Sequence, residues 1–102
     1  MKICTFYTTD RSDDDFIPAV IEATGETVDD LVPTITDEVA QEIAIAQEVG
    51  KTLWIEDQDG NMIDKSVFAV SEALANGATC IVLKNTLPTG EKYENVFTIH
   101  TI

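Results

Sequence analysis

Five segments of the chain carry the pattern of β-strands. Residues 2–8 are rich in β-branched and aromatic types, and 78–84 form a continuous apolar run that is typical of a central strand. Residues 94–102 alternate between two sets of side chains, which predicts a last strand paired with 78–84 through a hairpin. A second hairpin is expected from 51–56 and 61–63, which flank an Asp-Gln-Asp-Gly turn.

Between these strands, apolar residues recur at the spacing of a helix. Within 16–21, apolar side chains recur at i, i+1, i+4 and i+5. This spacing predicts a helix that begins at 14–15 and ends at Gly25. Another helix is expected over 65–76, with Asp64 as its N-cap.

The longest helix is predicted over 37–49, with Thr36 as its N-cap. Before it, 27–30 have the pattern of a capping box. Because Pro33 follows so soon, only one short turn of helix is expected there.

The expected element order is therefore β-α-(α)-α-β-β-α-β-β, where the parentheses mark the short turn. Two hairpins separated by a helix indicate an α+β fold. We expect an antiparallel or mixed sheet of about five strands with two to three helices on one face. A chain of 102 residues is expected to form one small domain over 1–102.

Charge distinguishes this chain from a generic α+β domain. It has 19 Asp and Glu against six Lys and Arg, a formal net charge of -13. Nearly all of the excess lies between Asp10 and Asp64, where only Arg11 and Lys51 are basic, whereas 65–102 have no net charge. This composition excludes nucleic-acid binding through a basic surface and argues against docking to an anionic membrane.

The helix dipole explains part of this acidity, because acids are favourable in the first turn of a helix. The acids at expected helix starts are Asp13, Asp14, Asp15, Asp29, Asp30, Asp37 and Glu38. The dipole does not explain Glu22, Glu26, Glu42 or Glu48. The acidity serves either general solubility, as in a halophilic protein, or a dedicated docking face, and we favour the docking face.

An apolar residue lies among the acids of the predicted long helix. The helix face expected to pack on the sheet carries Val39, Ala40, Ile43, Ala44 and Ala46. Ile45 falls on the other side, with Glu38 and Glu42. It is either covered by 27–33 or forms the apolar centre of an interface.

The sequence carries no enzyme signature, so neither a catalytic residue nor a cofactor is expected. Nothing brings a nucleophile to His100, the only histidine. Together with Cys4 and Cys80 it would supply only three zinc ligands, on three separate strands. A disulfide would require the strands of the two cysteines to be adjacent. The 57–61 turn does not match the spacing of a calcium loop, so no metal site is expected.

These observations predict a non-enzymatic inhibitor that mimics the charge of nucleic acid. It would block the basic groove of a nucleic-acid-binding protein in host defence or DNA processing, as anti-CRISPR or anti-restriction proteins of phages and mobile elements do. An alternative is an immunity protein or antitoxin that caps a cationic toxin nuclease. Another is a homo-oligomeric structural or accessory protein. The expected partner-binding residues are Asp13, Asp14, Asp15, Glu22, Glu26, Asp29, Asp30, Asp37, Glu38, Glu42, Ile45 and Glu48.

The sequence also predicts a location. The N-terminal segment lacks the apolar stretch and cleavage site of a signal peptide, and no apolar run approaches the roughly 18 residues that span a membrane. Two cysteines are too few for a disulfide scaffold. We therefore expect a protein of the host-cell cytosol that contacts neither nucleic acid nor membrane directly.

Overall fold

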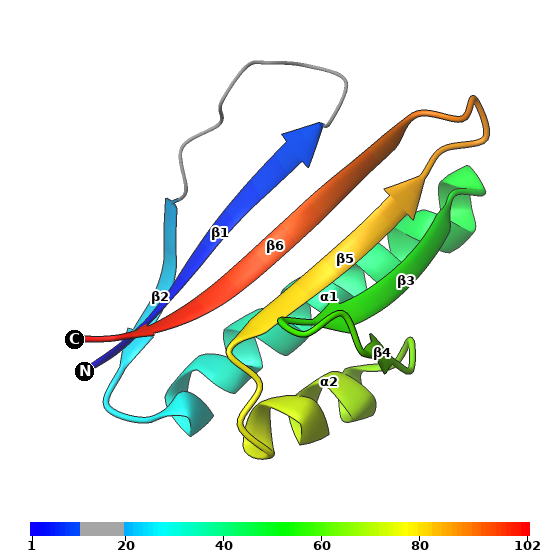
Figure 1. The fold of residues 1–102 in the computed structure, drawn as a ribbon. Coiled ribbons are helices and arrows are strands. Elements are labelled where there is room, and N and C mark those ends of the chain that lie inside the picture. Colours follow the sequence, from blue (N-terminus) through cyan, green and yellow to red (C-terminus); the bar gives the residue numbers. More distant parts are fainter. Residues whose placement is uncertain (11–19) are drawn as a thin grey trace.

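The computed structural model shows a six-stranded antiparallel sheet and two helices over residues 1–10 and 20–102, with Asp10 described by its backbone only. The sheet order is β2-β1-β6-β5-β3-β4 (Figure 1). The strands are β1 (Lys2–Asp10), β2 (Val20–Gly25), β3 (Thr52–Asp57), β4 (Met62–Ile63), β5 (Cys80–Thr86) and β6 (Lys92–Thr101). The helices are α1 (Val28–Val49) and α2 (Val67–Ala75).

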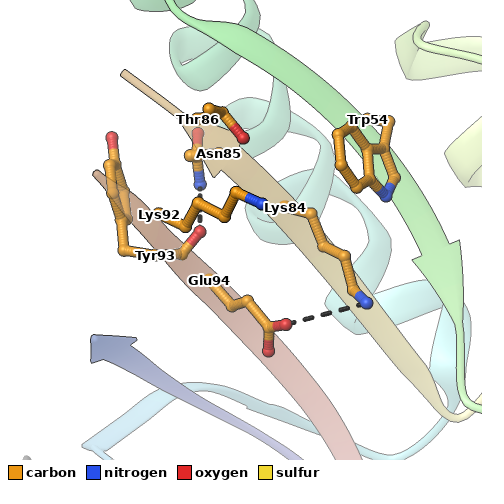
Figure 2. A pocket seen from close by; sticks show the side chains of 7 residues that line it. All are labelled: Trp54, Lys84, Asn85, Thr86, Lys92, Tyr93 and Glu94. Carbon is orange, nitrogen blue, oxygen red and sulfur yellow. Dashed lines mark hydrogen bonds and ion pairs between the residues drawn. The ribbon is translucent and has the colours of Figure 1, made fainter. Parts of the chain in front are cut away.

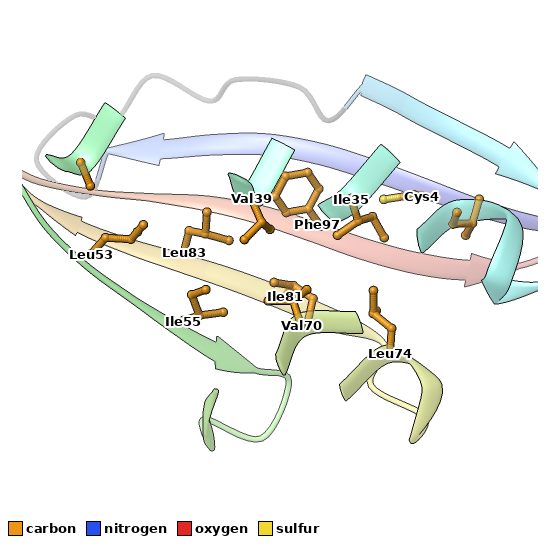
Figure 3. Close-up of a cluster of buried hydrophobic side chains, with 12 residues drawn as sticks. Cys4, Ile35, Val39, Leu53, Ile55, Val70, Leu74, Ile81, Leu83 and Phe97 are labelled. Atoms are coloured by element: carbon orange, nitrogen blue, oxygen red, sulfur yellow. The ribbon is translucent and has the colours of Figure 1, made fainter. Parts of the chain in front are cut away.

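Both helices pack on the same face of the sheet, which confirms the predicted α+β class with its helices on one face. Successive side chains of a strand point to opposite faces of the sheet, and the apolar side chains on one face form the core with the helices (Figure 3). Phe97 on β6 is 1% exposed, and its ring centroid lies 4.9 Å from that of Phe6 on β1. Buried residues of the helices include Leu31, Ile35, Val39, Val70 and Leu74.

The two predicted hairpins are confirmed. Strands β5 and β6 pair antiparallel, with Ile81 opposite Phe97. Strands β3 and β4 pair around the expected turn, where Gly60 has a φ of 80° that favours glycine. The ends of the described chain also meet, because β1 pairs with β6 and places Lys2 opposite Thr101. Figure 1 shows the two termini side by side.

The helix expected to end at Gly25 is wrong over the described residues, because Val20–Gly25 form strand β2. The expected start at 14–15 lies outside the described residues. Two β-branched residues begin β2, and the strand supplies backbone partners to the outer edge of β1. Gly25 is needed for a close approach rather than for a helix end, since a Cβ there would collide with the Cβ of Asp30. The sheet therefore has six strands instead of about five, and the order becomes β-β-α-β-β-α-β-β.

One continuous helix, α1, replaces the short turn and the separate 37–49 helix that the sequence predicted. The capping box is confirmed: the Thr27 N–H donates to Oδ2 of Asp30 at 3.0 Å. Pro33 lies inside the helix, and Thr36 is not an N-cap, because its hydroxyl donates to carbonyls of the preceding turn. Burial of one helix face against the sheet outweighs the single hydrogen bond that Pro33 removes.

Replacing Pro33 by alanine is expected to raise the free energy of unfolding by about 1–2 kcal/mol. Proline is about 3 kcal/mol less favourable than alanine inside a helix, and the more flexible unfolded chain offsets about 1 kcal/mol of that gain. Pro33 is exposed, so no core contact is lost. Urea unfolding followed by circular dichroism measures the change. The neighbouring Thr34→Ala should shift stability by less than about 0.5 kcal/mol; a loss of stability in Pro33→Ala would contradict the expectation.

Helix α2 begins later than predicted. Its N-cap is Ser66, whose Oγ accepts the N–H of Ala69 at 3.0 Å, and not Asp64. The helix then runs over Val67–Ala75, inside the expected 65–76.

The face of the sheet that points away from the helices is covered by no helix or strand of residues 1–10 and 20–102, and we call it the open face. Cross-strand register defines its members. On the four longest-paired strands they are Ile3, Thr5, Tyr7, Thr9, Thr52, Trp54, Glu56, Cys80, Val82, Lys84, Thr86, Lys92, Glu94, Val96, Thr98 and His100.

Candidate functional site

Helix α1 carries six acids and no Lys or Arg. Asp30, Asp37 and Glu48 are exposed and lie seven and eleven residues apart. At 3.6 residues per turn these spacings return to within about 20° of one line, with separations of about 10 Å and about 16 Å along the axis. We call this line the acidic stripe. Asp29 and Glu26, both exposed, lie at its N-terminal end.

A second group of carboxylates lies between α1 and β2. The register of β1 and β2 shifts between Cys4 and Thr5, which leaves Glu22 as the extra residue of a β-bulge. Glu22 and Glu38 are half-buried and close enough to interact. Partial burial raises the pKa of Glu38, and the nearby charges of Glu22 and Glu42 raise it further. Carboxylates of β2 and α1 therefore repel one another here.

Glu38→Gln is expected to raise the free energy of unfolding at pH 7 by about 0.5 kcal/mol, the size of a like-charge pair on a helix surface. Because folding raises the Glu38 pKa, ionised Glu38 destabilises the fold increasingly as the pH rises through that value. Below pH 4.5, the usual pKa of a glutamate, the difference in stability between variant and parent should disappear. Urea unfolding at pH 7 and at a pH below 4.5 measures this difference. Glu72→Gln, at an exposed position of α2, should change stability little at either pH.

Glu42 does not belong to the exposed face on which the sequence placed it. Its Oε2 lies 2.9 Å from Nζ of Lys51, whose side chain is 1% exposed. The Lys51 ammonium also donates to the Tyr93 hydroxyl at 2.7 Å. Burial alone would lower the Lys51 pKa, but the hydrogen bonds to Tyr93 and Glu42 outweigh it and raise the pKa. Glu42 is therefore a structural partner of Lys51.

Asp30 has a structural role in addition to its exposed position. Its Oδ2 accepts the N–H groups of Thr27 at 3.0 Å and Glu26 at 2.9 Å. These hydrogen bonds lower the pKa of Asp30, and the bond from Thr27 has the largest effect. The carboxylate consequently stays charged and fixes the start of α1.

Ile45 is 42% exposed, so the interpretation in which 27–33 covers it is wrong: that segment belongs to the same helix. Val49, one turn further on, is 50% exposed. The packing face also differs in part, because Ala40 and Ala44 are exposed whereas Val39, Ile43 and Ala46 face the core. Asp13, Asp14 and Asp15 lie outside the described residues.

A hollow of about 140 Å³ lies on the open face near the β5–β6 turn (Figure 2). Its lining residues are Trp54, Lys84, Asn85, Thr86, Lys92, Tyr93 and Glu94. The Trp54 indole N–H donates to Glu56 at 2.7 Å, which fixes the ring. The Lys84 ammonium lies 3.7 Å from Glu94 and 3.5 Å from Glu56. Two of the chain's few lysines therefore stand at this hollow, away from the acidic stripe.

Groups with chemical reactivity lie apart from one another. Cys4 is in the core, and burial raises its pKa to about 11; Cys80 lies on the open face, and burial raises its pKa too. Their strands are separated by β6, so they are not adjacent. His100 shares a 2.9 Å hydrogen bond with Thr5. Within 1–10 and 20–102, no three His, Cys, Asp or Glu side chains gather to hold a metal ion.

The Asp57 turn is a local structural device. Its Oδ1 accepts the backbone N–H groups of Asp59 at 2.9 Å and Asn61 at 3.0 Å. Burial acts to raise the Asp57 pKa, but these N–H groups outweigh it and lower the pKa. The segment is a hairpin turn, as predicted.

Comparison of the chain with protein-family models, with curated proteins and with solved structures finds no match. Neither helix of the described residues is long and apolar enough to cross a membrane.

Sequence reasoning missed a polar network inside the core. The Asn85 side-chain amide donates to Oδ1 of Asn95 at 2.8 Å, and Asn95 donates to the Thr8 hydroxyl at 3.2 Å. The network links β5, β6 and β1 and specifies their register. The sequence does show one asparagine within each of these two strands. Only the register makes them diagonal neighbours, with Asn85 opposite Tyr93 and Asn95 opposite Leu83.

Proposed function

We propose that the protein is a non-enzymatic inhibitor that docks its α1 surface into the basic, nucleic-acid-binding groove of another protein. The partner would belong to host defence or DNA processing. The docking residues are Glu22, Glu26, Asp29, Asp30, Asp37, Glu38 and Glu48, with Ile45 at the flank.

The observation that carries this proposal is the acidic stripe. Asp30, Asp37 and Glu48 hold carboxylates on one line of a rigid helix, about 27 Å from first to last. No cation of α1 neutralises them, and the Lys51 ammonium is occupied by Glu42 inside the structure. Nucleic-acid-binding proteins align Lys and Arg to meet regularly spaced phosphates, so such a line offers them similar partners and steers association.

Ile45 supports the same surface from the side. An exposed apolar residue within a turn or two of carboxylates resembles the anchor of an interface, where a buried apolar contact is surrounded by charged groups. In this arrangement the carboxylates accelerate encounter and the apolar contact slows dissociation.

The test is capture followed by competition. The immobilised protein is exposed to an extract of its source cells, bound proteins are identified by mass spectrometry, and duplex DNA is then added. A basic nucleic-acid-binding protein that the DNA releases is the expected result. A bound protein that excess DNA does not release would contradict the proposal, as would direct binding of DNA by the protein itself at low salt.

A further inference from the structure

The open face has an apolar centre. Tyr7, Val96 and Val82 lie directly opposite one another on β1, β6 and β5. Val96 is 5% exposed, and Tyr7 and Val82 are half-buried. Trp54 stands in the next row of the face, with its indole fixed by Glu56. A tryptophan, a tyrosine and two valines thus lie on a face that no helix of the described residues covers.

Over the described residues of β1, β3, β5 and β6, the open face carries no net charge, although the chain as a whole carries -13. On β1, β3, β5 and β6, where the described residues define the face, its charged side chains are Glu56, Lys84, Lys92 and Glu94, two of each sign. Lys84 forms ion pairs with both glutamates, at 3.5 Å and 3.7 Å. Among the described residues, the six acids of α1 and Glu22 of β2 lie on or beside the helix side of the sheet.

We propose that this face is the interface of a homodimer. Two copies that approach through their helices bring carboxylates against carboxylates, and they repel each other. Two copies that approach through their open faces bring together surfaces without net charge. Contacts across a two-fold axis are reciprocal, so a lysine of one copy that meets a glutamate of the other forms the same pair twice.

The size of the face suits a dimer. Strands β1, β6, β5 and β3 lie about 4.8 Å apart and rise about 3.4 Å per residue. The width and length of these four strands together give the open face a flat area of about 500 Å². The relief of the side chains increases the accessible area toward the roughly 600 Å² per partner at which specific interfaces begin. The hollow beside Trp54 provides a recess for a side chain of the second copy.

The dimer does not depend on the proposed inhibitor function. It would leave both acidic stripes on the outside, facing opposite ways. Its salt dependence is also opposite: salt screens the repulsion between two acidic copies and strengthens the dimer, whereas salt weakens a complex with a basic partner.

Sedimentation velocity of the full chain tests the proposal. Between about 0.1 M and about 1 M sodium chloride the Debye length falls from about 10 Å to about 3 Å. We expect a species of twice the 11.2 kDa chain mass, whose dissociation constant falls as salt rises. A monomer at all concentrations and salt levels would overturn the proposal, as would a dimer that salt dissociates.

Two charge-reversal variants locate the interface. Lys92→Glu gives each open face an excess of two negative charges and should weaken the dimer at least about tenfold at low salt. Lys65→Glu changes the net charge of the chain equally but lies ahead of α2, off the open face. It should weaken the dimer much less. Equal effects of the two variants would show that the copies meet elsewhere.

Substitutions of apolar residues give an independent check. Val82→Glu places a carboxylate at the centre of the face and should abolish the dimer. Phe68→Glu introduces the same group at a residue that is 77% exposed on α2, and the dimer should persist. If Val82→Glu does not fold, as judged by circular dichroism, Thr98→Glu on the same face replaces it. Persistence of the dimer in the folded variant would contradict the proposed interface.

Discussion

Replacing Glu42 by leucine is expected to lower the free energy of unfolding by about 3 kcal/mol. The change leaves the Lys51 ammonium buried, with the hydrogen bond to the Tyr93 hydroxyl at 2.7 Å still in place. Removal of one partner from a buried ion pair costs about 3–5 kcal/mol, because the other charge loses its compensation. The low end applies, since the Glu42 side chain is 22% exposed. Urea unfolding at pH 7 measures the loss.

The double variant Glu42→Leu with Lys51→Met is the control. It removes both charges and keeps the volume apolar, so it should recover most of the lost stability, as replacement of a whole buried pair often does. A double variant as unstable as Glu42→Leu alone would show that packing, rather than the stranded charge, causes the loss.

Neutralising four acids of the α1 surface is expected to slow association with the basic partner about tenfold to a hundredfold at low salt. The variant carries Glu26→Gln, Asp29→Asn, Asp37→Asn and Glu48→Gln. It omits Asp30 and Glu42, because the first fixes the start of the helix and the second holds Lys51. Steering depends on the summed field of such charges, so the change should appear mainly in the association rate. Surface plasmon resonance with the captured partner measures it.

A matched variant separates the α1 surface from total charge. Asp59→Asn, Asp64→Asn, Glu72→Gln and Glu91→Gln remove the same four charges from exposed positions outside α1. Association should slow much less in this variant. If both variants bind equally fast, or if the α1 variant binds like the parent, the acidity serves solubility and the α1 surface is not the docking site.

Local patterns were sufficient for most strands. The continuous run at 78–84 and the alternation at 94–102 predicted a hairpin that the structure confirms as β5 and β6. Turn chemistry predicted the β3–β4 hairpin, where Gly60 has positive φ. These strands and turns depend on residues that are close in the sequence, so the sequence alone was sufficient to predict them.

Tertiary context decided the elements that sequence reasoning got wrong. Val20–Gly25 fit a helical spacing, but pairing with the edge of β1 makes them a strand. Pro33 suggested a break, but burial of Leu31 and Ile35 on both sides of it keeps α1 continuous. In both cases a local preference of a few kcal/mol is outweighed by long-range burial and pairing.

The candidate site was predictable in its chemistry and not in its geometry. Counting acids found the charge of α1, and the exposed position of Ile45 agrees with one of the two interpretations offered for it. The role of Glu42 required knowledge that Lys51, nine residues later, turns back into the core beside Tyr93. The neutral open face required the strand register, which no local pattern specifies.

The pairing of β1 with β6 has a consequence for the time at which the sheet can form. Lys2 and Thr101 are 99 residues apart, yet their side chains are joined by a hydrogen bond. At about 5–20 residues per second, the ribosome completes β6 roughly 5–20 s after β1. During that interval β1 has β2 as a neighbour on one side and an unpaired edge on the other. A nascent chain halted before Lys92 therefore exposes this edge, and a chaperone that shields strand edges would find its substrate there.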